Sequence, residues 1–238
     1  MFGIVALQGL TLVYMERKVS AWMQSRLGPN RVGPWGLLQT VADIVKLILK
    51  ENIRNDQADK VFFALAPILA FVAPFAAFVT IPIAETVGFK DLNMGAVYIF
   101  ALSSSVIFSI IWAGYGSNNR YALIGAMRSA AQMISYEVPL VTSVLGIFLI
   151  AGTFSMKEIV ALQGNGVWYI LYQPFGFILF LIAATAEANR APFDLPEAES
   201  ELVAGFHTEY SGMKFAFFFL GEYVEMLVSC SIMALLFL

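Results

Sequence analysis

The chain has 238 residues, of which 59% are hydrophobic and 13% are charged, and its formal net charge is −3. A soluble domain carries about twice that charged fraction, and so many apolar residues would leave large exposed patches in water. The composition therefore excludes an ordinary soluble domain and indicates an integral membrane protein.

Residue types that bind metals are scarce. The chain has one cysteine, Cys230, and one histidine, His207. One thiol forms neither an internal disulfide nor, by itself, an iron–sulfur cluster, and one imidazole forms no histidine cluster. The glycine-rich motifs of nucleotide-binding loops are missing as well. We therefore expect no metal and no bound cofactor in this chain, so that any redox group belongs to a partner.

Long apolar runs predict an all-α, polytopic membrane helix bundle. A spanning helix needs about 20 mostly apolar residues, and the sequence supports about six such spans in a single transmembrane domain. The predicted spans are residues 1–15, 62–83, 94–113, 129–151, 167–186 and 213–238. The first run is short and the last reaches the end of the sequence, which favours a fragment that lacks the last spans.

Basic residues are divided unequally between the connections. If the spans alternate, connections 16–61, 114–128 and 187–212 share one side, and 84–93 and 152–166 share the other. The second side carries only Lys90 and Lys157. The first side, with Lys214 at its boundary, carries Arg17, Lys18, Arg26, Arg31, Lys46, Lys50, Arg54, Lys60, Arg120, Arg128 and Arg190. The positive-inside rule then places the long charged connections in the cytoplasm, or in the matrix of an organelle.

The first connection contains a predicted helix at 35–50. It follows the Gly/Pro-rich loop from Arg26 to Pro34, which should be rigid because proline fixes φ and glycine permits positive φ. Apolar residues recur at helical spacing, while polar residues interrupt the run and prevent spanning. This pattern predicts an amphipathic helix in the membrane interface. The alternative is a solvated helix that packs on a neighbouring protein.

Three glutamates lie inside predicted spans: Glu137 in the fourth, and Glu222 and Glu225 in the last. A carboxylate near the bilayer centre costs at least about 2.5–3.5 kcal/mol. These acids must therefore face the protein interior or water, or be protonated. Glu222 and Glu225 share a helix face, and neighbouring carboxyls titrate as a pair, as a proton relay requires. The alternative is a set of protonated acids that only hydrogen-bond across a helix interface.

The connection at 187–212 is acidic. Its acids are Glu187, Asp194, Glu197, Glu199, Glu201 and Glu209, with Arg190 among them. An acidic run is usually a solvated loop, but apolar residues such as Phe193 and Leu202 are interleaved here, so the loop should pack against something. Because it also joins two spans that bear or adjoin glutamates, we interpret it as a funnel for protons.

Three stretches resemble a known family. They are Met15–Gln39 (MERKVSAWMQSRLGPNRVGPWGLLQ), Ile134–Pro139 (ISYEVP) and Ala186–Leu202 (AEANRAPFDLPEAESEL), the last continuing through His207–Phe215 and Gly221–Tyr223. The chain is similar over essentially its whole length to the H subunit of bacterial respiratory complex I and to its mitochondrial counterpart, NADH dehydrogenase subunit 1. It has fewer spans than that family usually has, which leaves open whether it would close a quinone chamber alone.

The resemblance implies a role in a proton-pumping NADH:quinone oxidoreductase. This subunit would dock the peripheral arm, form the membrane-side entry of the quinone chamber and begin the proton path. The family's quinone passage matches Arg17 and Arg26, with Trp35 at its mouth, and its docking loops match Arg31, Arg190 and Asp194. The family's buried acids match Glu137, Glu187, Glu197, Glu199, Glu209 and Glu222, with Glu201 in the adjoining loop. Glu225 is assigned to the relay from its spacing alone.

The implied substrate is a quinone, and FMN and the iron–sulfur clusters would lie in partner subunits. The expected partners are the peripheral-arm quinone-site and iron–sulfur subunits, adjacent small and antiporter-like membrane subunits, and lipid, without nucleic acid. The expected location is the inner (plasma) membrane of a bacterium, or else the mitochondrial inner membrane. The alternatives are the related membrane subunit of a proton-pumping hydrogenase or formate hydrogenlyase, a stand-alone proton-coupled transporter, and a purely structural anchor.

Overall fold

The computed structural model describes the chain except residues 1, 54, 84–91, 165 and 195–203. The regular elements in the described part are all helices, which confirms the predicted all-α class. The α-helices are α1 (Phe2–Met23), α2 (Gln39–Leu49), α3 (Lys60–Ala77), α4 (Gly95–Gly116), α5 (Arg120–Ala151), α6 (Met156–Gly164), α7 (Tyr169–Tyr172), α8 (Pro174–Glu187) and α10 (Gly212–Phe237). Short 3₁₀ turns lie at Pro34–Gly36, Phe78–Thr80 and Gly205–His207.

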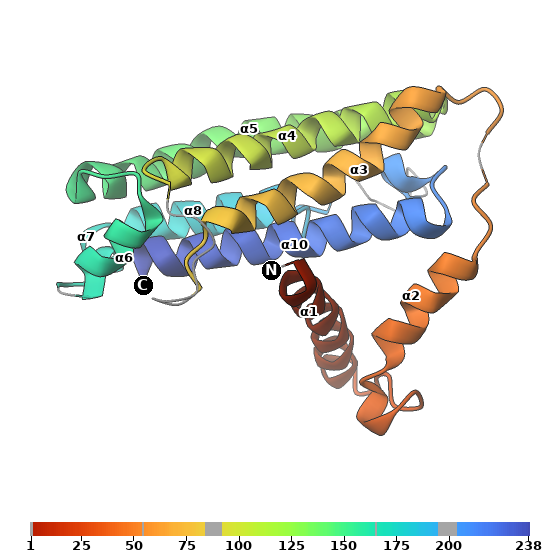
Figure 1. Cartoon of the computed structure of the whole chain (residues 1–238), viewed down its shortest axis with the longest axis horizontal. Coiled ribbons are helices and arrows are strands. Elements are labelled where there is room, and N and C mark those ends of the chain that lie inside the picture. Colours follow the sequence, from red (N-terminus) through yellow and green to blue (C-terminus); the bar gives the residue numbers. More distant parts are fainter. Residues whose placement is uncertain (1, 54, 84–91, 165, 195–203) are drawn as a thin grey trace.

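Five helices, α3, α4, α5, α8 and α10, form a bundle along the long axis of the molecule (Figure 1). Helices α1 and α2 leave the bundle obliquely and meet at their far ends. The α2–α3 and α4–α5 connections and the start of α10 lie at one end of the bundle, whereas α6 and α7 lie at the other. The starts of α3, α5 and α10 therefore lie at one end of the bundle, whereas the α1–α2 corner with the basic residues of 17–31 lies apart from it.

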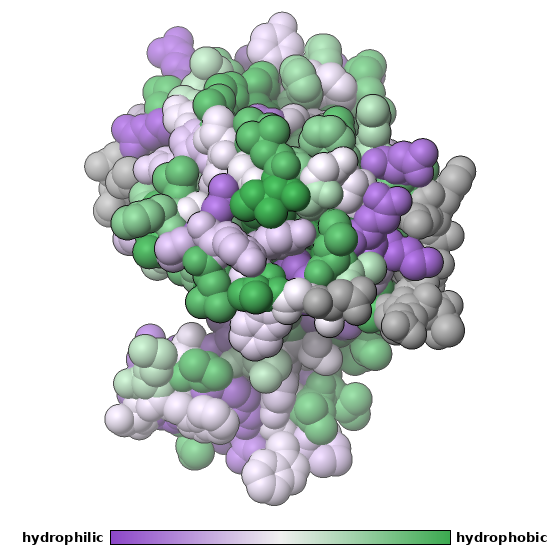
Figure 2. All heavy atoms as spheres, turned by 90° about the vertical axis from the view of Figure 1, so that its left-hand side faces the viewer, coloured by the Kyte–Doolittle hydropathy of each residue, from purple (hydrophilic) through white to green (hydrophobic). Residues whose placement is uncertain are grey.

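Within the part of the chain that the structure describes, four helical stretches are long and apolar enough to cross a membrane: Lys60–Thr80, Gly95–Gly116, Arg120–Ala151 and Gly212–Phe237. They overlap the predicted spans 62–83, 94–113, 129–151 and 213–238. Many of their large apolar side chains are exposed, as lipid-facing residues would be. Figure 2 shows hydrophobic and hydrophilic residues mixed on the end of the bundle near α6 and α7, with the α1–α2 part below a narrowing.

The apolar run at 167–186 is not one continuous helix. It divides into α7 and the 14-residue α8 at Gln173, which has non-helical backbone angles. The break has a local cause, because the ring of Pro174 disfavours the helical conformation in the residue before it. Helix α8 is about 21 Å long at 1.5 Å per residue, which is shorter than a hydrocarbon core of about 30 Å.

Helices α1 and α5 extend furthest beyond their predicted bounds. Helix α1 continues past residue 15 to Met23 and so includes charged residues of the first connection. Helix α5 begins at Arg120, where the Asn119 side chain caps it by accepting a hydrogen bond from the Tyr121 amide at 2.9 Å. The hydropathy pattern predicts that the span begins at residue 129, because Arg120 and Arg128 interrupt the apolar run. They do not interrupt the helix.

Candidate functional site: buried carboxyls beside an arginine-lined pocket

Carboxyl groups from three helices converge on two serines of α4. The Ser103 hydroxyl lies 2.7 Å from Glu187 Oε1, at the end of α8, and 2.6 Å from Glu225 Oε1, on α10. Its neighbour Ser104 is hydrogen-bonded to Glu137 on α5. Successive residues of a helix point about 100° apart, so the two serines reach different neighbours. The fold thus brings together acids that are far apart in the sequence.

The acids on Ser103 are enclosed by the bundle. Glu187 and Glu225 are each 6% exposed, while Glu137 is half-buried. A buried carboxylate is stable only when it is paired, hydrogen-bonded or neutralised, and the Ser103 hydroxyl supplies a hydrogen-bonding partner here. The structure therefore gives Glu225 a close acidic partner on another helix, Glu187, in addition to the Glu222 that its spacing suggests.

Glu222 has a different neighbour, which the sequence analysis missed. Its Oε1 lies 3.4 Å from Nε2 of His207, an imidazole that is 8% exposed and packed against Phe206 and Phe218. The pattern of apolar residues gives no signal for this contact, because it depends on the turn before α10 folding back over the bundle. His207 is thus part of the acidic site and not an isolated core residue.

A small internal pocket of about 30 Å³ lies among these acids. Glu187, Glu222 and Glu225 line it, together with Ser109, Asn189 and mainly apolar residues such as Phe206. A space of this size holds at least one water molecule, and the carboxyls supply the polar partners that such a water needs.

A second pocket, open and about 640 Å³ in volume, lies between α1, the loop after it and the inner face of α10. Arg17 and Arg26 both line it, together with Glu16, Arg190 and Tyr223. The two arginines assigned to the quinone passage by resemblance therefore border the same space. Arg17 is also paired with Asp43, which ties α1 to α2.

The inner wall of the open pocket is a hydrogen-bonded group. Glu16 accepts from the Tyr223 hydroxyl at 2.6 Å and from Arg190 Nη1 at 3.0 Å, and the Arg190 guanidinium lies 4.7 Å from the centre of the Tyr223 ring. Burial alone would lower the pKa of Arg190, but its interactions with Tyr223 and with the Glu16 carboxylate raise that pKa above its usual value. Arg190 therefore stays charged at the pocket wall.

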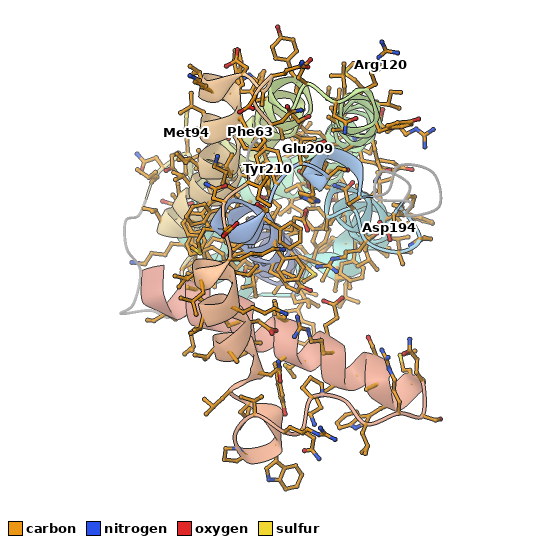
Figure 3. All side chains as sticks on the ribbon, turned by 90° about the vertical axis from the view of Figure 1, so that its right-hand side faces the viewer. Phe63, Met94, Arg120, Asp194, Glu209 and Tyr210 are labelled. Atoms are coloured by element: carbon orange, nitrogen blue, oxygen red, sulfur yellow. The ribbon has the colours of Figure 1, made fainter. Side chains whose placement is uncertain are left out.

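The other predicted site residues that the structure describes lie apart from this group. Glu209 accepts a hydrogen bond from Asn119 at 2.8 Å, and Figure 3 shows it away from Asp194, which is exposed at the edge of the bundle. Arg31 is exposed, and Trp35 is 78% exposed with its carbonyl accepting from Tyr14. Glu197, Glu199 and Glu201 lie outside the described residues.

Among the described residues, no three His, Cys, Asp or Glu side chains are grouped so that they could hold a metal ion. The clustered groups are instead carboxyls, serine hydroxyls and one imidazole. Carboxyls and an imidazole can gain and lose protons near neutral pH, and the serine hydroxyls can both donate and accept hydrogen bonds, so the arrangement suits proton movement.

Comparisons with known proteins identify the family of the chain. The family model described as NADH dehydrogenase matches residues 1–238. The NADH-quinone oxidoreductase H subunit of Brevibacillus brevis is 57% identical over 225 residues, which are 94% of this chain and 67% of that protein. The corresponding H subunit of Bacillus thuringiensis is 54% identical over 227 residues, 95% of this chain and 68% of that protein. The chain therefore belongs to the NADH dehydrogenase family.

Proposed function

We propose that this chain receives a quinone in its arginine-lined pocket and passes the resulting charge change to the buried acids. Family membership makes it a multi-pass membrane subunit of NADH-quinone oxidoreductase, a respiratory enzyme complex. The hydrogenase alternative is not favoured. The two relatives described above, at 57% and 54% identity, are both named as subunits of a quinone enzyme. The quinone pocket, the acid relay and the docking of partner subunits are the proposed parts of this role.

One observation carries the proposal: two short segments border both pockets. In the segment 187–190, Glu187 lines the acidic pocket and Arg190 lines the open one. In the segment 221–225, Glu222 and Glu225 line the acidic pocket and Tyr223 lines the open one. A change of charge in the open pocket therefore acts on the acids across one layer of side chains.

The chemistry follows from the groups present. Reduction of a quinone takes up two electrons, which partner subunits with FMN and iron–sulfur clusters would deliver, and two protons. Guanidinium groups such as Arg17 and Arg26 can donate hydrogen bonds to the quinone oxygens. The negative charge that develops during reduction raises the proton affinity of nearby carboxyls, because Coulomb interactions are strong in poorly solvated sites.

The proposed surroundings follow the same reasoning. The end of the bundle that carries the basic connections would face the cytoplasm of a bacterium and the peripheral arm. Arg31, Asp194 and the acidic loop with Glu197, Glu199 and Glu201 would contact that arm, and Trp35 would border the entrance for quinone and lipid. Adjacent small and antiporter-like membrane subunits would continue the path from Glu137 and Glu225.

Replacement of Arg17 tests the quinone pocket. In the intact complex, Arg17→Ala should raise the KM for a short-chain quinone by about tenfold, the effect of losing one charged hydrogen bond. The matched control is Asp43→Asn, which breaks the same ion pair but leaves the guanidinium in the pocket. An unchanged KM in Arg17→Ala, or an equal rise in Asp43→Asn, contradicts the assignment.

A further inference from the structure

Ser103 makes different contacts from the other serines in its stretch of α4. Ser104, Ser105 and Ser109 each donate to a carbonyl of their own helix, at 2.8, 2.6 and 2.7 Å, and Ser104 also contacts a single carboxyl, that of Glu137. Ser103 instead lies within hydrogen-bond distance of two carboxyl oxygens from two other helices. Its hydroxyl is therefore the meeting point of α4, α8 and α10.

The number of hydrogens at this point is informative. A serine hydroxyl has one hydrogen to donate and lone pairs to accept, and an ionised carboxylate can only accept. The two O···O distances of 2.7 and 2.6 Å can both be hydrogen bonds only if one of the two carboxyls carries a proton. One of the two carboxyls is then protonated and neutral, and the other is ionised and carries one negative charge.

We propose that Ser103 is a positioning residue that transfers this proton between Glu187 and Glu225, an inference that rests on the proposed function. When Glu225 is protonated, its O–H bond breaks as the proton moves to Ser103 Oγ. The original Ser103 O–H bond breaks as its hydrogen moves to Glu187. The serine ends unchanged, Glu187 becomes neutral and the negative charge moves to Glu225. The reverse exchange returns the proton.

The surroundings favour a fixed hydroxyl as the carrier. Both carboxyls are 6% exposed, so bulk water does not supply protons directly. Glu187 is three residues from Arg190 in the pocket wall, whereas Glu225 is one turn further along α10 than Glu222. The bridge therefore links an acid close to the quinone pocket with one deeper in the bundle, and it makes Glu225 a member of the relay through Ser103.

The test uses the intact complex reconstituted in liposomes, with quinone reduction and proton pumping recorded together. Ser103→Ala should lower pumping by about tenfold or more, since a hydrogen bond to a charged group is lost. Ser103→Cys, which nearly keeps the volume but donates weakly, should show a similar loss. Ser103→Thr retains the hydroxyl and should restore most of the pumping. Ser105→Ala, whose hydroxyl bonds only its own helix, is the matched control and should pump normally.

Two further measurements distinguish a role of Ser103 in proton transfer from a role in helix packing alone. Infrared difference spectra of the wild type should contain a protonated-carboxyl band that shifts in heavy water, and this band should change in Ser103→Ala but not in Ser105→Ala. If the serine acts through Glu225, the double variant Ser103→Ala/Glu225→Gln should be no worse than Glu225→Gln alone. Equal losses in the Ala and Thr variants with an unchanged band would overturn the proposal.

The failure of this inference differs from the failure of the proposed function. Normal pumping in Ser103→Ala, together with lost pumping in Glu187→Gln, refutes the serine bridge and leaves the relay intact. Normal pumping in Glu187→Gln refutes the relay itself and, with it, the bridge.

Discussion

Tyr210 lies just before α10 with its ring stacked on Phe63, at 4.3 Å between centres and 9° between planes. Its hydroxyl is buried and has no hydrogen-bond partner among the described residues. Burial raises the pKa of this phenol above its ordinary value. The ring thus contributes packing, while the unpaired hydroxyl costs stability.

Removing that hydroxyl should therefore be harmless or favourable. The folded state holds Tyr210 neutral, whereas an unfolded tyrosine ionises near about pH 10, so the wild type loses stability as the pH rises above that value. Tyr210→Phe should keep or raise the melting temperature at neutral pH and should reduce the alkaline loss. Tyr115→Phe, at an exposed ring, is the control. A lower melting temperature for Tyr210→Phe at neutral pH would mean that the hydroxyl has a stabilising partner.

Single residues of the site were predictable where charge makes them conspicuous. Glu137, Glu222 and Glu225 stand out because lipid disfavours carboxylates, and Arg17 and Arg26 stand out by resemblance. Ser103 and His207 gave no such signal, since a serine or a histidine in an apolar segment is common in helix packing. Their roles depend on which helices cross, and that information is not local.

At the scale of elements, close helix contacts position the acids. Helices α3 and α10 approach each other at Gly221, where an added Cβ would lie 2.5 Å from the Ala70 carbonyl oxygen. Gly221 immediately precedes Glu222, so any separation of the two helices displaces the acidic site.

The substitution Gly221→Ala should therefore harm both stability and coupling. Overpacking of this kind typically costs about 1–3 kcal/mol, and the shift should lower quinone reduction as well. Gly3→Ala serves as the control, because nothing lies within 4 Å of the Cβ added there. Thermal unfolding and activity of the purified complex check both expectations. If Gly221→Ala matches Gly3→Ala, the close packing at this point has no importance.

Hydropathy predicted helices better than it predicted their ends. The apolar runs at 62–83, 94–113, 129–151 and 213–238 each correspond to a long helix. Helix α5 extends further because Arg120 and Arg128 are compatible with a helix once it leaves the apolar layer. The helix break at Gln173 is a backbone effect of Pro174. A hydropathy average cannot predict such a break, because it measures only how apolar the side chains are.

At the scale of the whole molecule, the arrangement predicts opposite exposure of two lysines. Lys50, at the end of α2, and Lys157, in α6, are both exposed. They lie in connections that are predicted to be on opposite sides of the membrane. Single cysteines at these positions, in a Cys230→Ser background, should react with a membrane-impermeant reagent from opposite faces, with position 50 reacting from the cytoplasmic face. Labelling of both from one face would overturn the proposed topology.

The clustered acids should behave as one coupled set. Glutamine preserves the shape of glutamate but carries no titratable proton, so Glu187→Gln and Glu222→Gln should assemble and yet lose quinone reduction and pumping together. Glu158→Gln, at an exposed acid of α6, should change neither. Members of one path fail as a unit, so the double variant should be little worse than either single variant.

The most direct measurement is a double-mutant cycle on the complex in liposomes, with Glu187→Gln and Glu222→Gln alone and combined. Quinone reduction and the pH gradient are recorded in the same sample. A shared path predicts strongly non-additive losses in both quantities. Normal pumping in both single variants, or strictly additive losses, would contradict a shared path.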